Sequence, residues 1–159
     1  MVITSFMSSR FPRRNIIFNW MYLKNLEQKK FILYVEDENV QAKIFSKIIE
    51  NEVQNFGYEV IVFDNGSDFI DLLNSKNKNY QIEQFGLILL DLSMHDYSGI
   101  SMLNEAKAKN LKTPIAIFSA REDQLTKEKA IELGAKDYFI KGKNLMELER
   151  LRKFIIENM

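Results

Sequence analysis

Short apolar runs alternate with longer amphipathic stretches from residue 31 to the end of the chain. The apolar runs predict five strands, at residues 31–35, 58–63, 85–90, 113–118 and 137–140. The stretches that follow them repeat apolar residues near a helical period and predict five helices, at residues 39–56, 67–75, 99–110, 123–133 and 145–158. Polar tracts at residues 76–84 and 92–98 are predicted loops. This alternation is typical of βα units and of a parallel sheet.

The first and third strand-like runs are apolar throughout, which is the pattern of strands buried on both faces of a sheet. The run at 85–90 is the most hydrophobic, so we predict that it is central. In the helix predicted at 39–56, the side chains that fall near a helical period, and so form the predicted apolar face, are Val40, Ile44, Phe45, Ile48, Ile49 and Val53. With 159 residues, the chain is long enough for one such α/β domain and short for two.

Composition excludes several classes of site. The chain has no cysteine, which excludes disulfides, thiolate nucleophiles and sulfur-bound metals. Its single histidine, His95, excludes a metal site built from two histidines. Hydrophobic residues at 46% and charged residues at 28% are ordinary for a folded soluble domain. No window approaches the roughly 18 consecutive apolar residues of a membrane span.

Charge is unevenly placed although the formal net charge is zero. Residues 1–26 contain four basic residues and no acid, whereas the remainder carries an excess of acids. We predict that residues 1–30 form a basic N-terminal extension outside the βα units. A late translation start, a disordered leader, an extra helix docking on the domain or on a second copy, and a membrane or nucleic-acid contact all remain open for it.

Polar residues stand where four of the predicted strands end, and parallel sheets present their sites at that edge. These residues are Glu36, Asp37, Asp91, Ser119 and Lys141. Crowded carboxylates repel one another, so a hard cation such as Mg²⁺ is the natural neutraliser. A lysine ammonium and a hydroxyl remain to hold phosphoryl oxygens. An aspartate carboxylate can itself be the nucleophile and form an aspartyl phosphate.

Four stretches of the chain carry a family resemblance. ILYVEDEN, LILLDLSMHDYSG, PIAIFSA and GAKDYFIKG resemble, in order and spacing, the receiver domain of two-component response regulators over roughly residues 30–157. The resemblance implies a flavodoxin-like (βα)5 fold, a doubly wound parallel sheet with strand order 2-1-3-4-5. It also implies a receiver domain over residues 31–159.

The resemblance implies a cation site beside the phosphoacceptor. Asp91 would accept the phosphoryl group. Asp37 and Asp91 would bind Mg²⁺ directly, Glu36 would bind it mainly through water, and the backbone carbonyl of Ser93 would complete the protein ligands.

Further roles follow from the same resemblance. Ser119 would hydrogen-bond the phosphoryl group, Lys141 would pair with it, and Tyr138 would be the aromatic residue that turns from solvent toward the core on activation. Two positions depart from the family pattern: His95 and Gly142 stand where proline is usual. A cis bond before glycine costs about 2.5–4 kcal/mol more than trans, so the trans form is favoured at Lys141–Gly142 and the aim of Lys141 would change.

The function implied is a phosphorylation-dependent signalling switch, a regulatory phosphoacceptor with self-catalysed phosphorylation and dephosphorylation rather than a metabolic enzyme. The phosphoryl donor would be a sensor histidine kinase or a histidine phosphotransfer protein in the cytoplasm. An unknown downstream protein would bind the face made by residues 123–133, 137–140 and 145–158. No DNA-binding domain is expected after the last helix, and a homodimer could form through that face or the extension.

Other readings of the same residues stay open. Glu36 and Asp37 could have no role beyond offsetting the dipole of the following helix. Ser119 could simply hydrogen-bond to the backbone, and Tyr138 could serve only in core packing. His95 is expected to face solvent. The whole chain could be a pseudo-receiver, an adaptor that binds a protein partner without phosphate. A flavodoxin-like nucleotide binder is disfavoured because no glycine-rich phosphate loop follows residues 31–35.

Overall fold

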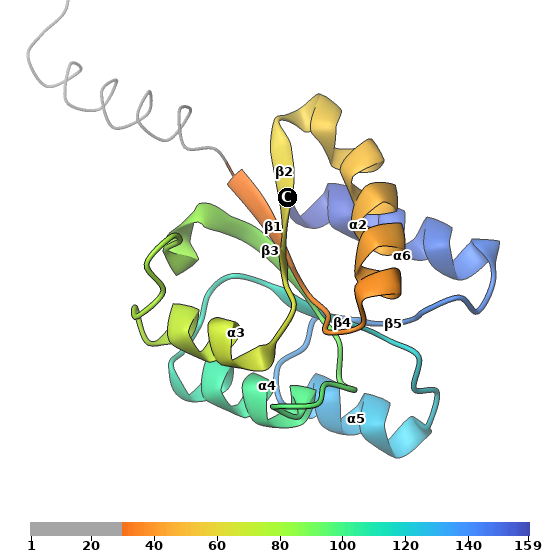
Figure 1. Cartoon of the computed structure of the whole chain (residues 1–159). Helices are drawn as coiled ribbons and strands as arrows, with labels where there is room; N and C mark the ends of the chain where they lie inside the picture. The colour runs from red at the N-terminus through yellow and green to blue at the C-terminus, as the bar shows by residue number, and fades with distance from the viewer. Residues whose placement is uncertain (1–29) are drawn as a thin grey trace, which may run out of the picture.

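The structure is a computed structural model that describes the backbone of residues 30–159 and the side chains of residues 31–159 (Figure 1). Predictions for the N-terminal extension therefore lie outside the described residues, except that Lys30 itself begins the first strand. None of the helices in the described part of the chain has the length and apolarity that a membrane span requires.

Five parallel strands form one sheet in the order β2-β1-β3-β4-β5, as predicted. They are β1 (Lys30–Val35), β2 (Tyr58–Phe63), β3 (Phe85–Leu90), β4 (Ile115–Ser119) and β5 (Tyr138–Ile140). The most hydrophobic of them, β3, occupies the centre, where neighbours on both sides satisfy its backbone. The carboxyl ends of all five strands therefore meet at one edge.

Helices connect successive strands and cover both faces of the sheet, so the fold is doubly wound. They are α2 (Asn39–Val53), α3 (Gly66–Leu73), α4 (Gly99–Ala108), α5 (Gln124–Glu132) and α6 (Leu145–Asn158), with short 3-10 turns η1 (Gln54–Phe56) and η2 (Ile82–Gln84). Figure 1 shows α2 and α6 on one side of the sheet and α3, α4 and α5 on the other.

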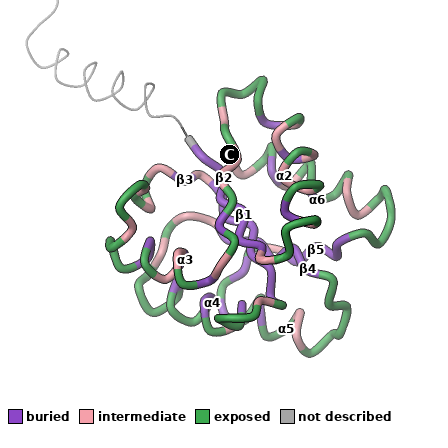
Figure 2. Tube along the Cα trace, viewed as in Figure 1, coloured by how far each residue is buried: buried purple, intermediate pink, exposed green. Residues whose placement is uncertain are grey.

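The sheet separates two apolar cores, because successive side chains of a strand point to opposite faces. Ile32, Leu89 and Phe139 pack under α2 and α6. Leu33 and Ile88 pack under the other three helices. In Figure 2 β1, β3, β4 and β5 are buried almost throughout, whereas the edge strand β2 is mostly intermediate or exposed and the outer surfaces of the helices are exposed.

Polar N-cap side chains determine the first residue of four of the helices. Asn65, Ser98, Asp123 and Asn144 each accept a hydrogen bond from the backbone N–H three residues later. This contact satisfies one of the amides that the first turn of a helix leaves unpaired. The start of every helix after α2 is therefore fixed by its own sequence.

The predicted apolar face of α2 was partly wrong. Val40 and Ile44 are 62% and 53% exposed, whereas Ala42, Ile49 and Val53 are buried against the sheet. Val40 and Ile44 lie four residues apart, so they share a second helical stripe that is rotated away from the buried one. The helix itself ends at Val53 and closes through η1, and η2 lies inside the stretch predicted as a loop.

Candidate functional site

Backbone hydrogen bonds align the ends of the strands and bring the predicted site residues together. The N–H of Asp91 donates to the carbonyl of Val35 at 3.1 Å, so the end of β3 stays paired with the end of β1. The N–H of Lys141 donates to the carbonyl of Ser119 at 3.0 Å, which pairs β5 with β4 in the same way. The register of the parallel sheet thus places Glu36, Asp91 and Lys141 directly after their strands and Ser119 at the last position of β4.

Lys141 joins two carboxylates inside the protein. Its Nζ donates to Asp91 Oδ2 at 2.7 Å and also to Glu36 Oε2. The three residues are only 8%, 5% and 1% exposed, respectively. Charges at such depth require partners, because the cost of removing them from water is large. The ammonium of Lys141 therefore neutralises part of a buried acidic site.

Glu36 is held by more than the lysine. The hydroxyl of Tyr34 donates to Glu36 Oε2 at 2.8 Å, and the N–H of Glu38 donates to Oε1 at 3.1 Å. Burial raises the pKa of Tyr34, so its hydroxyl remains a hydrogen-bond donor. Both oxygens of Glu36 are therefore already engaged by protein groups.

Asp91 also uses both oxygens. While Oδ2 meets Lys141, Oδ1 accepts a hydrogen bond of 3.1 Å from the N–H of Ser93. This contact folds the start of the loop between β3 and α4 back over the carboxylate. The carboxyl group is thus fixed at the end of β3, next to the backbone of the residue predicted to offer a carbonyl ligand.

Ser119 is wholly buried, and its hydroxyl lies near that of Tyr138 but is the one buried side-chain polar atom without a well-formed hydrogen bond among the described residues. Leaving such a group unpaired costs about 1–3 kcal/mol. It lies at the end of β4, where Ser119 pairs in register with Ile140, the residue before Lys141. An unpaired donor at this edge suits an anionic ligand that brings its own oxygen.

Tyr138 differs from the expectation that its ring begins in solvent. It is buried, and its hydroxyl donates to the carbonyl of Arg121 at 2.9 Å, in the loop between β4 and α5. Burial raises the pKa of Tyr138 to about 12. The inward position is possible because the carbonyl of Arg121 satisfies the hydroxyl that burial would otherwise leave unpaired.

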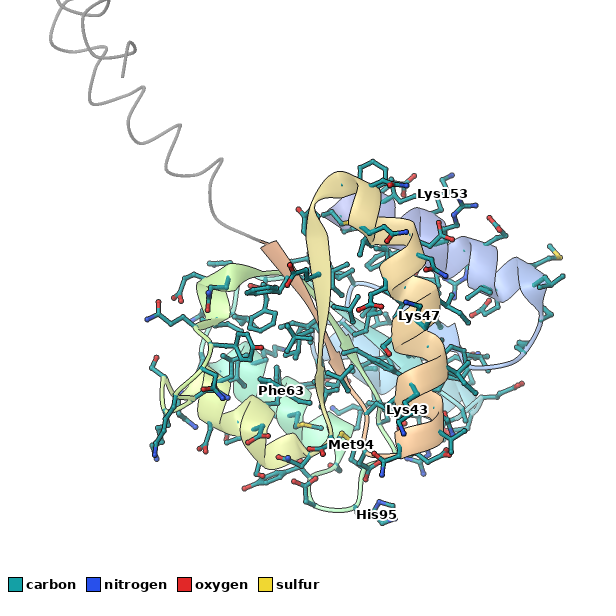
Figure 3. The ribbon with its side chains drawn as sticks, turned by 45° about the horizontal axis from the view of Figure 1, so that its top comes forward. Lys43, Lys47, Phe63, Met94, His95 and Lys153 are labelled. Atoms are coloured by element: carbon teal, nitrogen blue, oxygen red, sulfur yellow. The ribbon has the colours of Figure 1, made fainter. Side chains whose placement is uncertain are left out.

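Asp37 faces a different partner from the other two carboxylates. Its Oδ2 accepts a hydrogen bond of 2.7 Å from the N–H of His95, and Nδ1 of the His95 ring lies 2.5 Å from the same oxygen. The hydrogen bond and the charge of Asp37 raise the pKa of His95. Figure 3 shows His95 on the loop at the rim of the molecule, near the end where α2 begins.

The sequence predicted an exposed His95, and the ring is indeed 94% exposed, but its contact with Asp37 was missed. One signal in the sequence could have indicated this contact: where the family usually has proline, this chain has a residue with both a backbone N–H and an imidazole. Gly142, the other departure from the family pattern, follows Lys141 through a trans bond and has a φ of +66°. This left-handed conformation favours glycine, and Lys141 still reaches Asp91.

The donor set fits a hard divalent cation. Lys141 pairs with Glu36 and Asp91, whereas Asp37 contacts His95, so the carboxylates at this edge outnumber the one buried ammonium. Carboxylate and carbonyl oxygens with water are the ligands that Mg²⁺ prefers. Within residues 31–159, no three acidic or histidine side chains form a ready-made metal cage. The cation would therefore need backbone and water oxygens as well.

Comparison with known proteins agrees with this geometry. The sequence matches the response regulator receiver domain family over residues 32–153. It is 30% identical over 129 residues to the transcriptional regulatory protein CrdR of Helicobacter pylori, and the match covers 80% of this chain and 55% of CrdR. The chain spans about half the length of the curated relatives it matches.

Solved structures share the fold. The phosphorylated cyanobacterial phytochrome response regulator RcpA is similar with a TM-score of 0.65 and 26% identity, over 80% of this chain and 91% of RcpA. The Mn²⁺-bound response regulator Rcp1 is similar with a TM-score of 0.63 and 24% identity, over 79% of this chain and 91% of Rcp1. Together with the family match over residues 32–153, these findings establish that the chain belongs to the receiver domain family of two-component response regulators.

Proposed function

We propose that this protein is a signalling switch that accepts a phosphoryl group on Asp91. Membership of the receiver family implies phosphoryl-accepting signalling, and one observation supports Asp91 as the acceptor. Asp91 is a buried carboxylate at the end of the central strand, held at 2.7 Å from the ammonium of Lys141. That ammonium is positioned to offset the charge that a phosphoryl group would add.

The chemistry proposed is a transfer between a phosphohistidine and an aspartate. An oxygen of Asp91 attacks phosphorus, the P–O bond to Asp91 forms, and the P–N bond to the histidine of the donor breaks. The donor nitrogen leaves with its electron pair. Lys141 stays beside the phosphoryl oxygens, and the unpaired hydroxyl of Ser119 donates to one of them.

We propose that Asp37, Asp91 and the carbonyl of Ser93 hold a Mg²⁺ ion. Bound there, the cation supplies positive charge to the phosphoryl oxygens. Glu36, which is held by Tyr34, Lys141 and the N–H of Glu38, would act mainly through water. The Mn²⁺ in Rcp1, which shares this fold, is consistent with a divalent cation at such a site.

The exposed apolar stripe on α2 supports a protein as the phosphoryl donor. Val40 and Ile44 lie in the first two turns of α2, directly after Asp37, and both are exposed. An apolar surface beside the acceptor would bind the helix of a histidine kinase or histidine phosphotransfer protein. Such a donor is cytoplasmic in the family, so the same location is proposed for this chain.

The output surface proposed is the face made by α5, β5 and α6. Tyr138 of β5 is tied to the loop that follows Ser119 through the carbonyl of Arg121. A phosphoryl group bound by Ser119 would act on that same loop. The downstream partner is a protein that binds this face, and a second copy of the chain is one candidate.

The test is phosphorylation by a small-molecule donor. Acetyl phosphate with Mg²⁺ should add one phosphoryl group by intact-mass measurement, and Asp91→Asn should add none. Asp37→Ala should lower the Mg²⁺ affinity more than Glu36→Ala does, as measured by calorimetry. A wild-type protein that neither labels nor binds beryllofluoride with Mg²⁺ would instead act as a phosphorylation-independent adaptor.

A further inference from the structure

His95 places an imidazole, a nitrogen ligand for metals, beside the proposed cation site. It is the only histidine in the chain, and it lies in the loop between β3 and α4. Its backbone N–H and its ring nitrogen Nδ1 both contact Asp37 Oδ2, at 2.7 and 2.5 Å. A single residue thus joins the loop that follows the acceptor to the carboxylate that follows β1.

Other charged groups near this loop already have partners. Glu36 and Asp91 are bound to Lys141, and the carboxylate of Asp96 accepts hydrogen bonds from the N–H groups of Gly66 and Ser67. The side chain of Asp37 is 11% exposed, so one of its surfaces opens toward the imidazole and solvent. Asp37 and His95 therefore form a pair separate from the ion pairs of Lys141.

We propose that His95 is an additional ligand that gives this site a preference for borderline transition dications such as Ni²⁺ and Zn²⁺ relative to Mg²⁺. The proposal rests on the proposed function, in which Asp37 holds a cation. Imidazole nitrogen binds Ni²⁺ and Zn²⁺ well, whereas Mg²⁺ takes oxygen ligands and releases water reluctantly. An imidazole added to carboxylate and carbonyl oxygens therefore changes the relative affinities.

The position of the ring makes this role accessible without rearrangement of the core. The ring is 94% exposed, so no packing is lost when it turns. Its backbone N–H holds the residue beside Asp37 whatever the ring does. A cation between the ring and the carboxylate would replace the direct contact of Nδ1 with Oδ2.

The first experiment compares metal affinities by calorimetry on the tag-free chain of 159 residues. The variant is His95→Asn, which keeps the backbone N–H and a polar side chain but removes the imidazole. We expect the affinity for Ni²⁺ and for Zn²⁺ to fall about tenfold or more, with the Mg²⁺ affinity changed less than about threefold. Asp37→Asn, the control, should weaken all three.

The second experiment observes the ring itself. Because His95 is the only histidine, its imidazole ¹⁵N signals are assigned without ambiguity. Zn²⁺ should shift the resonance of the coordinating nitrogen, and Mg²⁺ should not. Unchanged ring shifts during Zn²⁺ binding, or an equal change of all affinities in His95→Asn, would overturn the proposal while Mg²⁺-dependent phosphorylation of Asp91 stood. A wild-type chain that binds no dication would overturn both.

Discussion

Among the buried side chains that the structure describes, Lys141 is the one cation, and it faces two carboxylates. A buried ion pair persists only where good geometry and further hydrogen bonds offset the loss of hydration. Glu36 gains such a bond from the hydroxyl of Tyr34, and Asp91 gains one from the N–H of Ser93. The carboxylate of Asp91, the proposed acceptor, is therefore held from two sides.

Replacing Lys141 by methionine should lower the free energy of unfolding by about 3 kcal/mol, because both carboxylates would stay buried without a counter-charge. Urea unfolding at neutral pH without added metal measures this. The double variant Lys141→Met, Asp91→Asn should recover part of the loss, since one stranded charge is then removed. If Lys141→Met unfolds at the same urea concentration as wild type, the carboxylates are compensated by something other than the ammonium.

At the scale of elements, β5 is an edge strand of three residues that α6 holds in place. Arg150 donates to Asp137 Oδ2 at 2.7 Å and to the carbonyl of Tyr138, and Glu147 accepts a hydrogen bond of 3.0 Å from the N–H of Ile140. These side chains satisfy backbone groups that an edge strand would otherwise expose. The short strand that carries Tyr138 and precedes Lys141 is thereby fixed.

Stability should depend on pH through Glu147. Its hydrogen bonds with Arg150 lower the pKa of Glu147 in the folded state. Stabilisation from such a carboxylate is present above its unfolded pKa of about 4.3, and it is lost as pH falls through the lower folded value. Glu147→Gln should therefore be about 1 kcal/mol less stable near neutral pH, and this difference should shrink toward about pH 3. Urea unfolding at both pH values measures it.

The control for Glu147 is Glu157→Gln on the same helix, whose carboxylate is 59% exposed. That variant should follow the pH dependence of wild type. A Glu147→Gln variant that loses as much stability in acid as wild type does would show that the acid sensitivity arises elsewhere in the domain.

The exposed stripe of α2 gives a second prediction at this scale. Ile44→Glu should slow phosphoryl transfer from a phosphohistidine protein at least tenfold, about 1.4 kcal/mol or more, because a charge would replace apolar contact area. Labelling by acetyl phosphate should be unchanged, since that donor needs no docking surface. Phe56→Glu is the matched control, because Phe56 is similarly exposed in η1, just beyond the far end of α2. Equal transfer rates for Ile44→Glu and wild type would contradict α2 docking.

The elements themselves could be predicted because each strand is a short apolar run with a helical pattern after it. The buried face of α2 could not be predicted, because the apolar residues of this helix form two stripes and only packing against the sheet decides which stripe is buried. Strand-end positions were predictable for Asp91 and Lys141, since the register of a parallel sheet aligns them. The contact of His95 with Asp37 could not be predicted, because it depends on the path of the loop between β3 and α4. The partners of Glu36 and Asp37, which are Lys141 and His95, could not be predicted from the sequence, because they depend on how the loops fold.

At the scale of the whole molecule, the described residues close both cores without the extension. The strand β1 begins at Lys30, and the family match begins at residue 32. Deleting residues 1–26 should therefore leave a cooperative thermal transition and Mg²⁺-dependent labelling of Asp91. Loss of the transition would make the extension part of the fold. A change from dimer to monomer, measured by light scattering, would identify it as an assembly element.

The proposed signalling would require that the edge holding Asp91 and the α5-β5-α6 face respond together. Tyr138 is already inward, so phosphorylation would stabilise this arrangement rather than create it, and the partner would reciprocally stabilise the phosphorylated form. Such coupling is typically worth about 1–3 kcal/mol. Beryllofluoride with Mg²⁺ should therefore slow hydrogen exchange in β5 and in the loop after Ser119. Tyr138→Ala should abolish that response, although acetyl phosphate still labels Asp91. An undiminished response in Tyr138→Ala would place the coupling outside the contact between its hydroxyl and Arg121, and Tyr138 would then be core packing alone.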